Sequence, residues 1–210
     1  MLRLTGDDGA LTTSDDATVI VSDPAPPPGA TVLEVPVRTS ADDAEERTST
    51  GAVSLASGDL NLGLDGTAAQ TVAMRFTSVT LPPGATITAA WVQFQVDEAS
   101  TAAASLTVAG EAADNAAAFT TTIRSISTRT RTTATVSWTP VSWPTVGART
   151  ADQRTPDLTA VLQAIVSRPL WASGNALVLL VTGTGTGTRV AESVDGGALK
   201  APVLHIEYTG

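Results

Sequence analysis

The chain has 210 residues, of which 42% are hydrophobic and 16% are charged, and its formal net charge is −9. The hydrophobic share is enough to fill a core, and the acidic balance argues against binding to nucleic-acid phosphates or to anionic lipid. The chain contains no cysteine, which excludes a thiolate nucleophile, a cysteine-ligated metal and a disulfide framework.

The first 23 residues are expected to form a unit of their own. Leu2 and Leu4 alternate with polar residues, residues 6–9 predict a turn, and residues 17–22 are rich in β-forming side chains. The segment "LRLTGDDGALTTSDDATVIV" resembles the last two strands of a PKD- or Ig-like domain. The resemblance implies that residues 1–23 are remnant strands of an upstream domain, of a kind strung along secreted bacterial proteins.

Residues 24–29, "PAPPPG", are typical of a linker. Four of the five residues 24–28 are proline, which imposes a stiff, extended conformation. We therefore place a domain boundary here and assign residues 30–210 to the main domain.

The main domain is predicted to be mostly β. Strands are expected at residues 31–37, 52–55, 71–77, 86–96, 105–109, 134–138, 176–182, 188–193 and 202–208. Clusters of Gly, Pro, Asp and Ser separate them. Many successive strands with almost no helix between them predict an all-β fold, a jelly-roll β-sandwich.

One segment, at about residues 156–168, has the pattern of a short capping α-helix. Its apolar residues follow the helical spacing, at Leu158, Val161, Leu162, Ile165 and Val166. Thr155 suits the N-cap, Pro156 suits the first helical position and Pro169 ends the helix. We expect this helix to cover one open end of the sandwich.

Two blocks of the main domain resemble DNRLRE-type carbohydrate-binding modules. In residues 70–98, "QTVAMRFTSVTLPPGATITAAWVQFQVDE", a strand ending in Arg-Phe precedes a Pro-Gly turn and a second apolar strand. In residues 155–181, "TPDLTAVLQAIVSRPLWASGNALVLLV", a capped helix with Gln163 precedes Asn175 and a hydrophobic strand. The resemblance implies a jelly-roll β-sandwich that binds polysaccharide within a secreted, multidomain protein.

A dense group of acids predicts a structural calcium ion. Calcium takes about six to eight oxygen ligands, and several carboxylates on one loop can supply them. The expected ligands are Asp42, Asp43, Glu45, Glu46 and Asp59. Asp97 and Glu98, at the end of a long strand, form a weaker candidate. The alternative is a solvated acidic loop whose charge Arg47 partly neutralises.

The expected sugar-binding face lies on the strand at residues 86–96. Alternate residues from Val92 to Val96 point to the core, so the opposite face carries Trp91, Gln93 and Gln95. An indole stacks on the C–H faces of sugars, and amides donate to and accept from hydroxyls. The alternative is that Trp91 is covered by another segment and that both glutamines simply face solvent.

Two further residues are expected to contribute to this site. Trp143, bracketed by Pro140 and Pro144 in a loop, either is accessible to a ligand or caps the end of the core. Arg75 is expected to project beside Trp91, where an arginine-lined groove would favour an acidic polysaccharide. The alternative for Arg75 is a structural ion pair with one of the many acids.

The sequence thus predicts a non-catalytic, calcium-stabilised carbohydrate-binding module of a secreted or cell-surface protein. Its expected partners are a polysaccharide and neighbouring domains of the same chain, with no nucleic acid and no membrane insertion. The alternative is a structural or adhesive spacer domain of a cell-surface or filament protein. We expect no enzyme, because the single histidine, His205, and the single tyrosine, Tyr208, fall on opposite faces of one strand.

Overall fold

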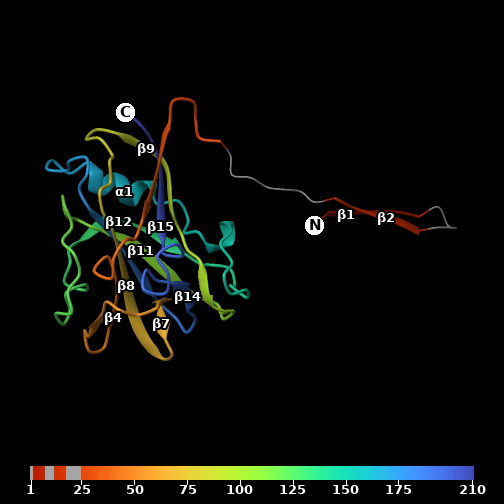
Figure 1. Ribbon diagram of the computed structural model, residues 1–210, viewed down its shortest axis with the longest axis horizontal. Coiled ribbons are helices and arrows are strands. Elements are labelled where there is room, and N and C mark those ends of the chain that lie inside the picture. The colour runs from red at the N-terminus through yellow and green to blue at the C-terminus, as the bar shows by residue number, and fades with distance from the viewer. Residues whose placement is uncertain (1, 8–11, 18–24) are drawn as a thin grey trace.

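The computed structural model describes residues 2–7, 12–17 and 25–210. Near the N-terminus, β1 (Leu2–Asp7) pairs antiparallel with β2 (Thr12–Ala17) in a two-stranded sheet (Figure 1). The β-rich run expected at residues 17–22 lies almost wholly outside the described residues. The assignment of this hairpin to an upstream domain stays a prediction.

The first layer of the main domain is a seven-stranded antiparallel sheet in the order β12–β11–β13–β8–β4–β5, with β7 beside β8. Its strands are β4 (Asp43–Arg47), β5 (Val53–Ser54), β7 (Leu64–Asp65), β8 (Ala68–Phe76), β11 (Leu106–Glu111), β12 (Arg131–Trp138) and β13 (Leu177–Gly183).

The second layer consists of two three-stranded antiparallel sheets, ordered β3–β15–β9 and β10–β14–β6. Its strands are β3 (Thr31–Pro36), β6 (Asp59–Leu62), β9 (Thr86–Gln93), β10 (Val96–Glu98), β14 (Arg189–Glu192) and β15 (Val203–Thr209). Phe94 and Gln95 alone separate β9 from β10 along the chain. The two sheets therefore continue one another along this path, at the point where the long strand expected at residues 86–96 is interrupted.

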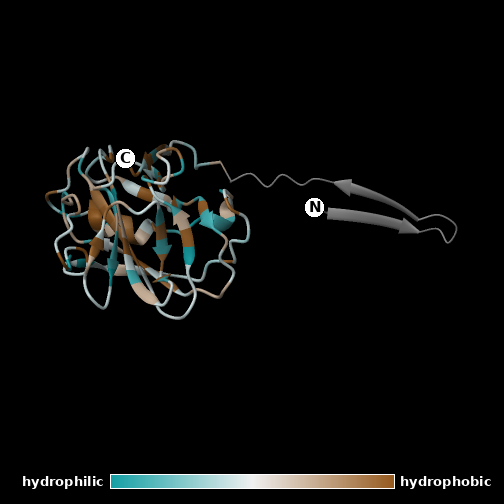
Figure 2. Cartoon of the chain, turned by 60° about the horizontal axis from the view of Figure 1, so that its bottom comes forward, coloured by the Kyte–Doolittle hydropathy of each residue, from teal (hydrophilic) through white to brown (hydrophobic). Residues whose placement is uncertain are grey.

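The apolar core lies between the two layers. Inward-facing residues from both layers belong to one buried cluster, and Val92, Phe94 and Val96 are 0% exposed, as the alternation predicts. Figure 2 shows the hydrophobic colouring gathered on strands inside the sandwich, with hydrophilic colouring on many of the connecting loops. The predicted all-β sandwich is thus confirmed, and the chain crosses between the layers several times, as in a jelly roll.

The predicted helix is present but shorter than expected. It is α1 (Thr159–Val166), and the five apolar residues of the predicted stripe are all buried. Thr155 does not cap it, because its hydroxyl accepts a hydrogen bond from the Val92 amide at 3.0 Å. Gly110 lets the helix approach β11, since a Cβ atom there would lie 2.7 Å from Ile165 Cδ1. Within the described residues, no helix has the length and apolarity needed to cross a membrane.

The sequence-based assignment missed three strands, β4, β6 and β7. The most instructive is β4, whose sequence "DAEER" suggested an acidic loop. Charged side chains disfavour a strand when they have no partners. In β4 each acid accepts hydrogen bonds from backbone amides of a segment distant in sequence, and this tertiary pairing outweighs the local preference.

Residues 112–130, between β11 and β12, cover the outer face of the seven-stranded layer. We call this segment the strap. Residues of β4, β8 and β13 that point away from the main core form a second apolar cluster with Phe119 and Ile126 of the strap. The first layer is therefore buried on both faces over these strands.

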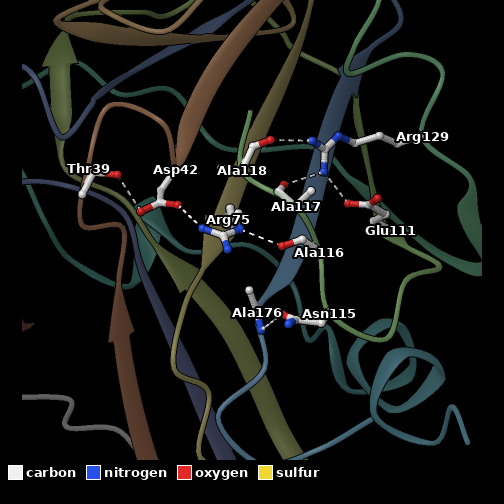
Figure 3. A network of polar contacts seen from close by, with 10 residues as sticks. All are labelled: Thr39, Asp42, Arg75, Glu111, Asn115, Ala116, Ala117, Ala118, Arg129 and Ala176. Atoms are coloured by element: carbon white, nitrogen blue, oxygen red, sulfur yellow. Dashed lines mark hydrogen bonds and ion pairs between the residues drawn. The ribbon is translucent and has the colours of Figure 1, made fainter. Parts of the chain in front are cut away.

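Two arginines, one on the sheet and one in the strap itself, hold the strap in place through its backbone and an ion pair (Figure 3). Arg75 Nε donates to the Ala116 carbonyl at 2.8 Å. Arg129 donates to the carbonyls of Ala117 and Ala118, pairs with Glu111 at 2.7 Å, and places its guanidinium 4.7 Å from the centre of the Phe119 ring. These contacts give the buried Ala116 carbonyl a partner and fix the more exposed carbonyls of Ala117 and Ala118.

Glu46 also holds the strap, but as a hydrogen-bond acceptor and not as a donor. It is 0% exposed, and its Oε2 accepts hydrogen bonds from the amides of Ile126 at 2.9 Å and Ser127 at 3.0 Å. Its Oε1 has no partner among the residues that the structure describes. The carboxylate thus compensates two buried amides at the cost of its own desolvation.

A second buried charge ties together loops at another part of the sandwich. Arg189 is 1% exposed and donates only to backbone carbonyls among its described hydrogen bonds. Its acceptors are Ala102, Thr188, Pro140 and Val141, at 2.6 to 2.9 Å. Five N–H donors in a fixed fork allow arginine to serve four carbonyls at once.

We expect Glu46→Leu to lower the free energy of unfolding by about 3 kcal/mol, because two buried amides lose their acceptor. Glu46→Gln, which keeps an amide oxygen in place, should cost less. Urea denaturation measures both, and hydrogen exchange should speed up at Ile126 and Ser127. Asp152→Leu, at an exposed acid, is the control; equal losses for Glu46→Leu and Asp152→Leu would contradict this role of Glu46.

Candidate functional site

The strap covers much of the first layer, whereas the outer face of the β3–β15–β9 sheet carries a row of polar and aromatic side chains. The register places His205 of β15 directly between Glu34 of β3 and Trp91 of β9. These three side chains form a row across the strands. Cross-strand neighbours of this kind lie close enough to interact.

Trp91 is held in this row from two sides. Its indole stacks on the His205 ring, with centroids 3.8 Å apart and an interplanar angle of 14°. The Arg154 guanidinium carbon lies 5.0 Å from the centre of the Trp91 ring. Since β15 and residue 154 border opposite edges of β9, His205 and Arg154 flank the indole on opposite sides. An open indole face for sugar stacking, which the sequence suggested, is therefore not what the structure provides.

Gln93 holds the arginine that flanks Trp91. Its Oε1 accepts a hydrogen bond from Arg154 Nε at 2.7 Å, and its Nε2 donates to the carbonyls of Phe94 and Thr150, both at 3.0 Å. The amide is thus engaged in positioning Arg154. In its described contacts the Gln93 amide bonds to neighbouring protein groups.

His205 is fixed by two carboxylates. Its Nδ1 lies 2.5 Å from Glu34 Oε1, and its Nε2 lies 3.3 Å from Glu207 Oε1. Glu207 is buried, whereas the Glu34 side chain is 58% exposed and stands at the rim. Both ring nitrogens are therefore occupied by protein groups, and the imidazole serves to stack and to link the two acids.

These residues line a hollow of about 320 Å³. Its wall also includes Arg149, an exposed side chain whose Nη1 donates to the Leu199 carbonyl at 2.9 Å. Ala25 and Pro26 of the linker complete another part of the wall. The hollow thus combines a fixed aromatic ring, basic groups and acidic groups around an open space, which is the composition of a polar ligand site.

The structure brings only part of the expected sugar-binding set together. Trp91 and Gln93 line the hollow, but Gln95 does not. The chain turns after β9, and the Gln95 carbonyl accepts a hydrogen bond from the Glu192 amide at 2.9 Å at the junction with β14. Ligand contact by Trp91 and Gln93 stays a prediction.

The expectation that Trp143 is accessible is wrong. Trp143 is 0% exposed, its Nε1 donates to the Asp152 carbonyl at 3.0 Å, and its ring packs near those of Phe94 and Trp138. Its backbone forms an isolated bridge with Ser100, which turns the side chain inward. Trp143 lies in a loop, as predicted. Its burial agrees with the alternative in which it caps the end of the core.

Arg75 does not lie beside Trp91. It belongs to β8 and points to the strap on the outer face of the first layer (Figure 3). Trp91 belongs to β9, in the second layer. Arg75 Nη1 pairs with Asp42 Oδ1 at 2.6 Å. The structural ion pair given above as the alternative is the observed one.

The acids expected to share one calcium ion are separated by strand alternation and by their partners. Asp42 pairs with Arg75 and also accepts from Thr39 Oγ1 at 2.8 Å. Asp43 Oδ2 accepts from the Val194 amide at 2.8 Å, and Glu45 Oε1 accepts from the Asn61 amide at 2.5 Å. Together with Glu46 under the strap, these acids act as acceptors for separate segments. The prediction of a single acidic loop is therefore wrong, because residues 43–47 form the strand β4.

A different acidic group could hold a metal ion. Among the residues that the structure describes, only Asp59, Asp97 and Glu98 place carboxylate oxygens within 4.8 Å of one another. Asp59 is oriented by hydrogen bonds from Ser57 Oγ at 2.6 Å and Asn61 Nδ2 at 3.1 Å. Burial, and then the neighbouring acids Glu192, Asp59 and Glu98, raise the pKa of Asp97. A hard cation would relieve this repulsion, so the donor set suits calcium.

Burial changes the acidity of two β4 carboxyls. It raises the pKa of Asp43 to about 7, with Asp195, Asp42 and Glu45 adding repulsion and the Val194 amide opposing the shift. Burial also raises the pKa of Glu45. The protonation of Asp43 is therefore coupled to folding near neutral pH.

Sequence reasoning missed most of the charged groups in the hollow. Glu34 of β3, Glu207 of β15 and the pair Arg149 and Arg154 come from three segments distant in sequence, and no short motif joins them. The strand alternation that put Trp91 outward also applies to His205, Glu207 and Glu34. Their common face could have been inferred, but the pairing of β9 with β15 and β3 could not.

Comparisons of the chain with known protein families and with curated proteins find no match.

The raised pKa of Asp43 predicts a specific pH dependence of stability. The folded state favours the protonated acid, so the stabilisation is complete below pH 4 and is lost as the pH rises through about 7. A shift from 3.8 to about 7 corresponds to about 4 kcal/mol across that window. Asp43→Asn should flatten this part of the curve in urea denaturation between pH 4 and 8. An unchanged slope, equal to that of an Asp152→Asn control, would contradict the assignment.

Proposed function

We propose that the chain is a non-catalytic carbohydrate-binding module that binds a polysaccharide in the hollow on the outer face of the β3–β15–β9 sheet. The observation that supports this proposal is the convergence of a fixed indole edge, acidic acceptors and basic donors on one open hollow. Sugars offer hydroxyls to such groups and apolar C–H edges to the ring. The resemblance of residues 70–98 and 155–181 to carbohydrate-binding modules supports the same reading.

The arrangement favours a glycan that carries carboxylates. Arg149 is exposed at the rim and donates to a backbone carbonyl, with no ion pair to a carboxylate among the described contacts. A guanidinium in this position can take a carboxylate in a bidentate manner. Arg154, held by Gln93, provides a second positive group that lines the same hollow.

The acids of the hollow support binding without catalysis. Glu34 and Glu207 both engage the His205 ring, so neither is an acid with a free position beside a scissile bond. A glycosidase needs one carboxyl kept protonated by its surroundings and a second across the bond. In this proposal the two glutamates set the orientation of His205 and thereby of Trp91.

The proposal extends to the setting of the module. A calcium ion held by Asp59, Asp97 and Glu98, with further oxygens from carbonyls or water, would join β6 to β10 in the second layer. An acidic module with a proline-rich linker suits a secreted or cell-surface protein in which neighbouring domains of the same chain lie in tandem.

Trp91→Ala and Arg149→Ala should each weaken binding of an oligouronate hexamer, because the first removes the fixed ring and the second removes the exposed guanidinium. The expected loss is about tenfold or more for each variant in isothermal titration calorimetry. Trp91→Ala should also weaken binding of a neutral hexamer, whereas Arg149→Ala should not. Arg38→Ala, at an exposed site outside the hollow, is the matched control. Wild-type affinity for the hexamer in both Trp91→Ala and Arg149→Ala would overturn the assignment of the binding site to the hollow.

Removal of calcium should lower the melting temperature reversibly. Chelation leaves Asp59, Asp97 and Glu98 in mutual repulsion, and restoring calcium should recover the loss. Asp97→Asn should reduce the response to chelator, while Asp152→Asn should leave it unchanged. A purified protein that contains no calcium and melts at the same temperature with and without added calcium would refute the ion.

One observation favours the second candidate function, a structural or adhesive spacer. Trp138, Trp143 and Trp171 are at most 4% exposed, and Trp91 is flanked on both sides. The described residues therefore hold no open tryptophan platform. A spacer predicts no glycan binding by the wild-type chain on a broad array of neutral and acidic polysaccharides, which is the outcome that would replace the first proposal with the second.

A further inference from the structure

The hollow has a wall that does not belong to the sandwich strands. Ala25 and Pro26, from the linker, line the same space as Trp91, Glu34 and His205. The linker reaches this position through a turn before β3, in which the Ala30 amide donates to the Pro27 carbonyl at 3.0 Å. A segment that connects the main domain to the residues before it is thus also a boundary of the hollow.

The linker is stiff before Gly29, and Gly29 is the point at which its direction can change. Prolines 26, 27 and 28 fix the backbone in an extended form with few alternatives. Gly29 follows with a φ of +84°, a conformation that favours glycine, and no atom lies within 4 Å of where its Cβ would be. A change at Gly29 therefore moves the prolines as a unit, and Pro26 cannot leave the hollow without changing the direction of the linker.

We propose that Ala25 and Pro26 are a working wall of the binding site, so that filling the hollow fixes the direction in which the linker leaves the main domain. This inference rests on the proposed function for the identity of the ligand. A ligand in contact with the wall binds better when the linker lies against the hollow. By reciprocity, binding then favours that linker position to the same extent. The site thereby couples glycan binding to the orientation of the segment that precedes it.

The coupling is tested on the full chain with an oligouronate hexamer as the probe. Pro26→Gly loosens the wall and should weaken binding roughly two- to fivefold, because the free linker gains conformations that binding must remove. Ala25→Trp should obstruct the hollow and weaken binding further. Ile123→Trp, a bulky change at a 67% exposed position on the strap, is the control and should bind as wild type.

A second measurement needs no ligand. The chain has no cysteine, so Ala25→Cys can be labelled at one position with a nitroxide that quenches tryptophan at short range. The label should quench the emission that is lost in Trp91→Phe. The same label at Ile123→Cys should leave this emission unchanged.

The outcomes separate the inference from the proposed function. If the wild type binds the hexamer and both linker variants bind equally well, the coupling is refuted and the binding function stands. If no chain binds the hexamer or any polysaccharide of the array, the proposed function fails. In that case, quenching of Trp91 by the label at position 25 still supports the position of the linker at the hollow. A lack of quenching refutes that position.

Discussion

Two-sided burial of the seven-stranded layer is the constraint on which the rest of the structure depends. The strap, residues 112–130, covers the face that points away from the core, and the strap groups that turn toward the sheet find hydrogen-bond partners on it. Glu46 accepts two strap amides, and Arg75 and Arg129 donate to three strap carbonyls. The strap occupies the outer face of the first layer, whereas the hollow opens on the outer face of the β3–β15–β9 sheet.

The same constraint explains the acidic sequence of β4. A run of carboxyls in a strand between two covered faces is stable only if each acid has a donor. Within β4, Asp43 accepts from the Val194 amide and Glu45 accepts from the Asn61 amide, while Asp42, the residue before β4, pairs with Arg75. The cost appears as the raised pKa of Asp43 and Glu45, which follows from burial. Acids whose sequence suggested a metal-binding loop therefore join separate segments of the chain by accepting hydrogen bonds from them.

Local periodicity was sufficient to predict much of the fold and little of the site. Alternation placed Val92 and Phe94 in the core and Trp91 outside, and helical spacing located α1, because both patterns are set by nearest neighbours along the chain. Partners could not be predicted in this way. Trp143 turned inward through a bridge to Ser100, and the hollow assembled groups from β3, β9, β15 and the segment at residues 149–154. Such contacts depend on sheet order, which periodicity does not contain.

We propose that the outer face of the β3–β15–β9 sheet binds glycan, whereas the strap closes the outer face of the other layer. Chemical-shift mapping by NMR during titration with an oligouronate hexamer tests it most directly. The account predicts that the largest changes fall on the indole N–H of Trp91 and on the amides around His205 and Arg149, with little change in the strap. Changes concentrated on the strap or on β12, with Trp91 and His205 unaffected, would contradict it.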